Sequence, residues 1–99
     1  MQELNYTFVA EPGQGKRQRA HVGVVGSGDL EVLYRPADSD QTKVRVRTSV
    51  DGFDTVWTWV LQRFFARHPL PGEFELNDFG ATPGVVNLRL RQVAEASRS

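Results

Sequence analysis

The hydrophobic pattern of this sequence changes its period once, at Asp51-Gly52, and that change limits the folds open to the chain. Before this dipeptide, apolar residues alternate with polar ones, which is typical of strands that have one face in water. After it, apolar residues recur three and four positions apart, which is typical of an amphipathic helix. The chain is therefore expected to build a sheet mainly from its first half, with helices that come late in the sequence.

Four runs of alternating residues precede the change, at 4–9, 17–25, 29–35 and 43–50. In the second run, Ala20, Val22 and Val24 are expected on one face of a strand. Gly26-Ser27-Gly28 separates the second run from the third, and a glycine-rich turn between two such runs favours a β-hairpin.

The strongest helical pattern runs from Phe53 to Arg67, with Phe53 and Val56 on its apolar face. Asp51 or Gly52 is expected to cap its start, because short polar residues and glycine are favoured there. Two prolines follow Arg67 within four residues and are expected to end the helix.

A fifth strand is expected around Phe74 to Phe79, and Thr82-Pro83 is a typical start of a second helix. On that helix, the spacing puts Arg89 and Arg91 on the outer face. The pattern as a whole predicts one two-layer α+β domain over residues 1–99. Its sheet would be mostly antiparallel, with about four to five strands and two helices packed on one face.

The composition argues against several classes of function. The chain has 12 basic and 12 acidic residues, and this zero net charge argues against a nucleic-acid partner. Its apolar runs are far shorter than a bilayer span, so no membrane is expected. With no cysteine and only two histidines, the chain has no thiol of its own and no metal site is expected. The first residues lack a signal-peptide pattern, so we expect a cytoplasmic location.

Ser27 is the residue of greatest chemical interest. Gly26 and Gly28 leave its hydroxyl unshielded, and at a hairpin tip another enzyme could reach it. A hydrolytic triad with His21 and Asp29 is disfavoured, because a triad needs an oriented base and an enclosed oxyanion site. From composition alone, a plain Gly-Ser-Gly turn is the simpler interpretation.

Three further features each have two interpretations. The basic run Lys16–Arg19 is either solvated surface or a patch for a phosphate-bearing group or an acidic partner. Trp59 is either a partner-docking anchor or part of the rim of the core. The segment Asn77–Gly84 is expected to be a loop, in which Asp78 either caps backbone donors or helps to dock a partner.

Several segments resemble one family. Residues 24–33, VVGSGDLEVL, resemble the attachment segment of the malonate decarboxylase delta subunit family, which comprises acyl carrier proteins. The likeness continues, in the family's order, at residues 48–53, 56–57, 63–71 and 77–86. The citrate lyase gamma subunit is a more distant likeness, which shares the serine-bearing segment in looser form.

The resemblance implies that Ser27 carries a phosphoribosyl-dephospho-coenzyme A group through a phosphodiester, attached by a dedicated prosthetic-group transferase. Gly26 and Gly28 would flank this covalent site, and Asp29 would be a recognition residue for the transferase. Arg17 or Arg19 would steady the phosphates. The chain itself would have no catalytic residue.

The thiol of this arm would carry malonyl and acetyl thioesters, while partner subunits supply the acyl-carrier transferase and decarboxylase sites. On this hypothesis the chain is the acyl carrier subunit of a malonate decarboxylase complex, with a single acyl-carrier domain over residues 1–99. Two alternatives stay open: an unmodified small scaffold or interaction subunit, and the carrier subunit of a citrate-lyase-type complex. The expected α+β fold differs from that of ordinary acyl carrier proteins, which are helical bundles.

Overall fold

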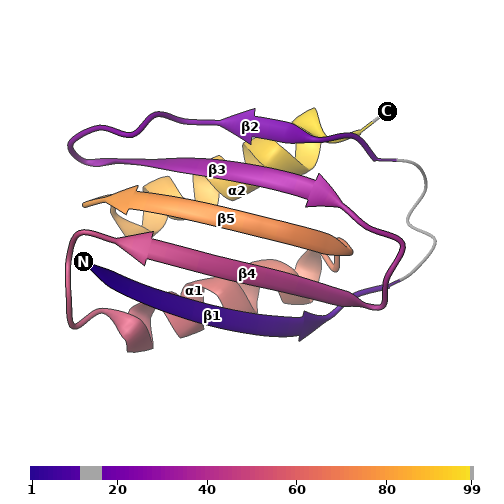
Figure 1. Cartoon of the computed structure of the whole chain (residues 1–99), viewed down its shortest axis with the longest axis horizontal. Coiled ribbons are helices and arrows are strands. Elements are labelled where there is room, and N and C mark those ends of the chain that lie inside the picture. The colour runs from indigo at the N-terminus through magenta and orange to yellow at the C-terminus, as the bar shows by residue number, and fades with distance from the viewer. Residues whose placement is uncertain (12–16, 99) are drawn as a thin grey trace.

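The protein is a five-stranded sheet with two helices behind it (Figure 1). The computed structural model describes residues 1–11 and 17–98. In chain order the elements are β1 (Gln2–Val9), β2 (Ala20–Val22), β3 (Asp29–Pro36), β4 (Gln41–Thr48), α1 (Asp54–Arg67), β5 (Gly72–Phe79) and α2 (Pro83–Ala96). Across the sheet the strands follow the order β1-β4-β5-β3-β2.

The connections explain the directions of the strands. β1 pairs with β4, β2 with β3, and β3 with β5, and all three pairs are antiparallel. β4 and β5 run parallel, because α1 lies between them in the sequence and returns the chain to the end of the sheet where β4 began. The predicted α+β class, the mostly antiparallel sheet and the helices on one face are confirmed.

The core lies between the sheet and the two helices. In β3, β4 and β5 alternate residues are buried on the helix side, as their hydrophobic alternation predicts. They meet buried side chains of the helices, namely Trp57, Val60, Leu61, Phe64, Phe65, Val86, Leu90 and Val93. Burying each large apolar side chain stabilises the fold by roughly 1.5–3 kcal/mol, so the alternating pattern decides which face of the sheet is covered.

β2 is shorter than predicted. Only Ala20–Val22 pair with β3, and the expected third member of that face, Val24, is 61% exposed. The strand ends because Gly23 adopts a φ of +79°, which lies outside the strand region. The predicted hairpin is confirmed, although its connection is the whole segment 23–28 rather than a tight turn.

The start of α1 also differs from the prediction. The N-cap residue is Phe53 rather than Asp51 or Gly52, and a phenyl ring offers no hydrogen-bond acceptor to the first turn. The prediction that Phe53 and Val56 belong to the core is wrong, since they are 50% and 39% exposed. Both line a groove that opens toward the start of α2 instead of packing under the sheet.

The segment before α2 is not the predicted loop. β5 continues through Asn77 to Phe79, and α2 already begins at Pro83. Thr82 is the N-cap of α2, as predicted, and its hydroxyl accepts a hydrogen bond from the Val85 N–H at 3.2 Å. The alternation of β5 puts Asp78 on the buried face, where it is 4% exposed.

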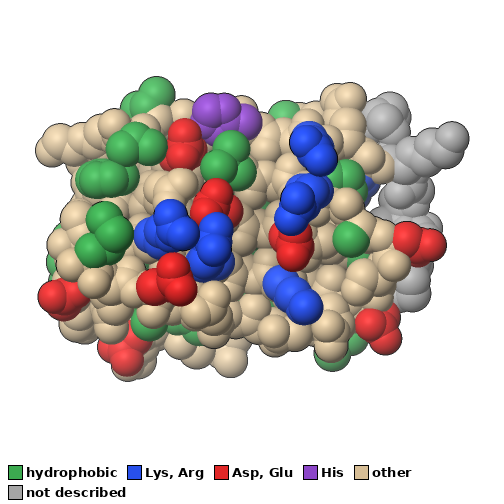
Figure 2. All heavy atoms as spheres, in the orientation of Figure 1, with side chains coloured by type: hydrophobic (Ala, Val, Ile, Leu, Met, Phe, Trp, Pro, Cys, Tyr) green, Lys and Arg blue, Asp and Glu red, His purple; other side chains and the backbone are tan. Residues whose placement is uncertain are grey.

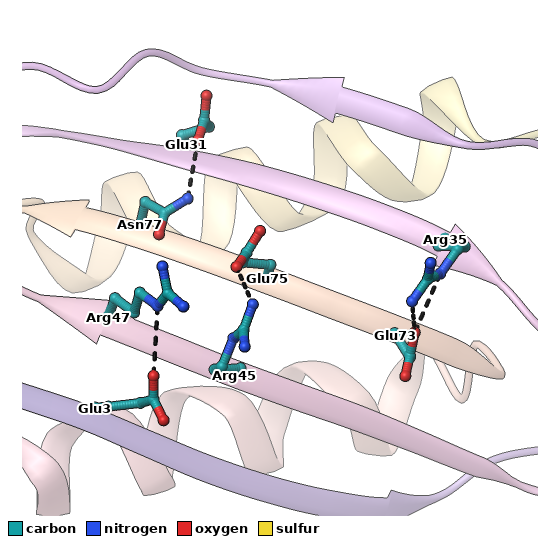
Figure 3. A network of polar contacts seen from close by, with 8 residues as sticks. All are labelled: Glu3, Glu31, Arg35, Arg45, Arg47, Glu73, Glu75 and Asn77. Atoms are coloured by element: carbon teal, nitrogen blue, oxygen red, sulfur yellow. Dashed lines mark hydrogen bonds and ion pairs between the residues drawn. The ribbon is translucent and has the colours of Figure 1, made fainter.

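The other face of the sheet is open and carries many charged side chains (Figure 2). Side chains on neighbouring strands pair across this open face, as Figure 3 shows. The pairs are Arg35–Glu73, Arg45–Glu75, Arg47–Glu3 and Asn77–Glu31. The wet face predicted from the alternation is therefore a network of polar contacts, most of them exposed.

Candidate functional site

Ser27 lies at the centre of a turn within the segment 23–28, here called the Ser27 loop. The Asp29 N–H donates a hydrogen bond to Gly26 O at 3.0 Å, so Ser27 and Gly28 are the central residues of a β-turn. Gly28 has a φ of +76°, whereas no described residue other than glycine has a positive φ. This is the pattern of a type II turn, which favours glycine at its third position. The turn leaves Ser27 exposed, as predicted.

Close backbone contacts hold the Ser27 loop against the end of the sheet. The Gly28 N–H donates a hydrogen bond to Phe79 O at 2.7 Å. At the start of the loop, Gly23 passes so close to β3 that a Cβ there would lie 1.9 Å from Leu30 O. Glycine is therefore required at position 23 by close approach as well as by its positive φ.

A two-pronged ion pair joins the base of the Ser27 loop to α2. Arg89 donates from Nε to Asp29 Oδ1 at 3.0 Å and from Nη2 to Oδ2 at 2.9 Å. The Leu30 N–H donates a further hydrogen bond to Oδ1 at 2.7 Å. The Arg89 guanidinium first, and then the Leu30 N–H, hold the pKa of Asp29 below its ordinary value. Asp29 is therefore a carboxylate already engaged as an acceptor, not a free base.

His21, Ser27 and Asp29 do not form a triad. His21 Nε2 lies 3.0 Å from Glu31 Oε2, while both oxygens of Asp29 face Arg89. The structure therefore gives no support to a hydrolytic triad, because His21 and Asp29 each contact another residue.

The basic run lies away from Ser27. Arg17 donates from Nη1 to Ser97 Oγ at 2.9 Å, beside the C-terminal end of α2. Arg17 and Arg19 precede β2, whereas the Ser27 loop follows it, so they lie toward the other end of that strand. The structure therefore does not place them beside the candidate phosphate position. Arg89 is the arginine that the fold brings to the Ser27 loop, and Lys16 lies outside the described residues.

The Ser27 loop can present a hydroxyl for covalent modification. Within the described part of the chain, no atom beyond Gly28 and its two chain neighbours lies within 4 Å of where a Cβ on Gly28 would be, and Ser27 itself is exposed. Val24 and Val25, earlier in the loop, are 61% and 55% exposed and offer apolar contacts to another protein. An exposed hydroxyl whose neighbouring carboxylate is already engaged suits modification by another enzyme better than catalysis. The exposed residues of the Ser27 loop therefore fit a group attached to the Ser27 hydroxyl.

Asp78 is buried, whereas Trp59 lies on the surface. Asp78 accepts hydrogen bonds from the Ala81 N–H at 2.9 Å and from the Thr48 hydroxyl at 2.8 Å, which supports its capping role. Trp59 is 55% exposed, and the guanidinium carbon of Arg63 lies 4.7 Å from the centre of the ring. Trp59 is therefore a surface residue, and its use as a docking anchor stays a prediction.

Arg89 is the site residue that sequence reasoning missed. Helical spacing assigns it to the outer face of the second helix, but its side chain turns toward Asp29, 60 residues earlier in the chain. A bidentate arginine–carboxylate pair is a specific geometry. No local pattern could have found it, because the pairing depends on where α2 crosses the sheet.

Residues 1–11 and 17–98 contain neither a metal-binding cluster nor a membrane-spanning helix. Within those ranges, no three His, Cys, Asp or Glu side chains are grouped so that they could hold a metal ion. Neither helix there is long and apolar enough to span a membrane. The Ser27 loop is thus the candidate functional site.

Comparisons with known proteins identify the family of the chain. A family model described as malonate decarboxylase delta subunit matches residues 17–97. The malonate decarboxylase acyl carrier protein of Azotobacter vinelandii is 48% identical over 96 residues, which cover 96% of this chain and 95% of that protein. The protein of the same name from Burkholderia cepacia is 48% identical over 92 residues, which cover 92% of this chain and 85% of the relative.

A solved structure gives the same answer for the fold. One chain of the crystal structure of a Pseudomonas malonate decarboxylase hetero-tetramer in complex with malonate superposes on this one with a TM-score of 0.85. The two sequences are 43% identical, and the match covers 96% of this chain and 97% of the other. Because the family model and the relatives span nearly the whole chain, including the Ser27 loop and Arg89, this chain belongs to the malonate decarboxylase delta subunit family.

Proposed function

We propose that this chain is the acyl carrier subunit of a malonate decarboxylase complex, and that Ser27 is the residue that carries its prosthetic arm. The observation that supports this most is the exposed Ser27 hydroxyl, on a turn that backbone hydrogen bonds hold against the sheet. The relatives of the chain are named acyl carrier proteins. Because the chain has no cysteine, any thiol that it carries must belong to an attached group.

The proposed group is phosphoribosyl-dephospho-coenzyme A, joined to Ser27 by a phosphodiester. When attached, it would supply a terminal thiol that takes acetyl and malonyl groups as thioesters. The exposure of Ser27 supports the attachment of a group at this hydroxyl. The identity of the group rests on the resemblance of residues 24–33 to the family's attachment segment.

This chain's own residues would present the hydroxyl and hold it still. In the attachment step, Ser27 Oγ would bond to phosphorus of a polyphosphorylated donor, and diphosphate would leave. The base that removes the proton from Ser27 Oγ would belong to the transferase. Asp29 would not be that base, since its oxygens already accept hydrogen bonds from Arg89 and the Leu30 N–H. With Arg89, it would instead hold the turn that the transferase recognises.

The partners would be the other subunits of the complex, which supply the acyl-carrier transferase and decarboxylase sites, and the prosthetic-group transferase. A covalent tether would keep the acyl group at high effective concentration near each site in turn. The exposed Trp59 would dock one of these subunits. We expect this assembly in the cytoplasm, without nucleic acid or membrane.

Ser27→Ala tests the proposal, with Ser49→Ala as the matched exposed serine. Both variants should fold like the parent, with a stability change within about 0.5 kcal/mol, because both are surface substitutions. Mass spectrometry of protein co-expressed with its transferase should find the arm on the Ser27 peptide of the parent and of Ser49→Ala, and on no peptide of Ser27→Ala. The reconstituted complex should turn over malonate with the first two proteins only.

Four results would contradict this assignment in different ways. An arm on another residue would remove Ser27 from the site. A complex that contains Ser27→Ala and still decarboxylates malonate would favour the scaffold alternative, as would an unmodified parent in an active complex. A modified chain that supports cleavage of citrate but not decarboxylation of malonate would point to a citrate-lyase-type carrier.

A further inference from the structure

Residues at the beginnings of α1 and α2 line a groove. Both helices begin at the end of the sheet where the Ser27 loop lies (Figure 1). The volume of the groove is about 340 Å³, which is within the range of roughly 300–1,000 Å³ typical of ligand pockets. Val50, Phe53 and Val56 form its rim, and Trp57, Val60 and Val86 form its buried part. We call it the Phe53 groove.

The rim of the Phe53 groove exposes apolar side chains that the fold itself leaves uncovered. Phe53 is 50% exposed, Val56 39% and Val50 37%, whereas Trp57 beneath them is 6% exposed. An aromatic ring and two branched side chains around a concave apolar surface mark a place where an apolar group can bind.

The wall of the groove is in direct contact with the Ser27 loop. Gly80 lines the groove, and a Cβ on Gly80 would lie only 3.9 Å from the backbone nitrogen of Gly28. That nitrogen also donates its hydrogen bond to Phe79 O. The Asp29–Arg89 pair fixes the loop to α2, one turn beyond the groove residue Val86. The loop that carries Ser27 therefore adjoins the wall of the groove.

We propose that the Phe53 groove binds the adenine ring of the arm attached to Ser27, an inference that rests on the function proposed above. In phosphoribosyl-dephospho-coenzyme A, the phosphoribosyl group that would join Ser27 is bonded to the adenosine, and the thiol lies at the far end. Adenine is thus the flat aromatic part of the arm that stays nearest to its attachment point.

The chemistry of the groove suits a purine. The ring of Phe53 and the side chain of Pro83 offer apolar surface for the face of a base. The exposed Thr82 hydroxyl also lines the groove, and a hydroxyl can donate a hydrogen bond to a ring nitrogen of adenine or accept one from its exocyclic amine. The tether raises the effective concentration of adenine at the groove, so even a weak contact would be populated.

Binding of this kind divides the arm into two parts. The adenine end would rest on the protein, and only the portion that leads to the thiol would remain free to move. A half-exposed rim makes this contact reversible, so the whole arm could still be released when a partner subunit needs a longer reach. The free thiol end would meanwhile lose less entropy on entering a partner's site.

Nuclear magnetic resonance of the apo and modified carriers tests the proposal. The two tryptophans provide an internal control, because Trp57 lines the groove and Trp59 lies on the exposed surface outside it. Attachment of the arm should shift the indole N–H signal of Trp57 several-fold more than that of Trp59. Nuclear Overhauser contacts should join the adenine H2 and H8 protons to the side chains of Phe53 and Val56.

Phe53→Ser removes the ring from the rim while placing a favoured N-cap residue at the start of α1, so folding is expected to survive. Leu88→Ser is the control, since Leu88 is 48% exposed, close to the 50% of Phe53, but does not line the groove. With the arm attached, Phe53→Ser should lose the Trp57 shift and the adenine contacts, and Leu88→Ser should retain both.

Contacts from the methyl groups of the pantetheine portion to Phe53, without contacts from adenine, would overturn the proposal. So would equal shifts at the two tryptophans, or contacts that survive in Phe53→Ser. In each case the mass of the Ser27 peptide would still show the arm, and the function proposed above would stand. Absence of the arm from that peptide would overturn both.

Discussion

The Ser27 loop and the open face of the sheet use the same residue types to different effect. On the open face, acidic and basic side chains pair between strands that already lie side by side, as in Arg45 with Glu75. At the Ser27 loop, one pair joins Asp29 to Arg89, on a helix 60 residues away. The pairs on the open face lie on a surface whose geometry the backbone already sets. The Asp29–Arg89 pair instead connects a loop to the helix layer.

Solvent exposure also separates the Asp29–Arg89 pair from the Arg35–Glu73 pair of the open face. The side chains of Asp29 and Arg89 are 20% and 26% exposed, whereas those of Arg35 and Glu73 on the open face are 50% exposed or more. Water and salt screen exposed pairs, and holding two long side chains in place costs entropy, so such pairs contribute little. The number of charged residues on a surface therefore says little about stability, whereas a shielded contact between two layers fixes the position of the Ser27 loop.

The largest effect is expected from Gly23→Ala at the base of the Ser27 loop. A Cβ at this position would meet Leu30 O at 1.9 Å, so backbone must move, and the φ of +79° adds strain. We expect a loss of about 3 kcal/mol or more in the free energy of unfolding. Urea denaturation measures it.

Gly28→Ala is the matched control for that variant, because its φ is +76° but no described atom lies within 4 Å of the new Cβ. It should cost only the strain of a left-handed residue, about 1–2 kcal/mol. Equal losses for the two variants would show that close approach at Gly23 does not hold the loop.

Asp78→Ala should have the next largest effect. Its carboxylate is buried and accepts hydrogen bonds from the Thr48 hydroxyl and the Ala81 N–H, which would lose their partner. We expect a loss of about 2–3 kcal/mol in stability by urea denaturation, and little change for the exposed Asp38→Ala. If Asp78→Ala keeps its stability but no longer assembles with other subunits, the docking interpretation replaces the capping one.

Arg89→Gln should loosen the Ser27 loop and lower the melting temperature by a few degrees, while Arg91→Gln, on the exposed side of α2, should not. Amide hydrogen exchange should rise at residues 24–29 in the Arg89→Gln variant only.

The stabilisation by the Asp29–Arg89 pair should depend on pH. Because Arg89 holds the pKa of Asp29 below its ordinary value, the pair's contribution to the free energy of unfolding is complete above that ordinary value. It is then lost as the pH falls through the lowered pKa, so parent and variant should converge in acid. A gap that stays constant with pH would exclude the ion pair as its cause.

The smallest effect is expected on the open face. A double-mutant cycle with Arg45→Gln and Glu75→Gln should give a coupling energy of about 0.2–1 kcal/mol that shrinks as salt is added. Urea denaturation of the four proteins at low and high salt measures it. A coupling above that range, or one insensitive to salt, would break the distinction between the two regions.

The sequence by itself determined the elements and the covered face. Alternation over residues 29–35 and 43–50 predicted β3 and β4, the period after Asp51-Gly52 predicted α1, and Thr82-Pro83 predicted the start of α2. These signals are local, because the backbone alternates side chains in a strand and repeats every 3.6 residues in a helix. The exposure of Ser27 also followed from a local signal, because its glycine neighbours have no side chains to shield the hydroxyl.

Only the tertiary structure decided how these elements make a site. The parallel pairing of β4 with β5, the engagement of Asp29 by Arg89, and the exposed positions of Phe53 and Val56 all depend on where distant segments meet. Period-based reasoning put Arg89 on the outer face and Phe53 in the core, because a periodic pattern defines a face of its own helix but not what that face meets. Which carboxylate lies opposite Arg89, and where the sheet stops covering α1, are set by strand order and helix packing, which join residues too far apart in sequence for any local pattern to record.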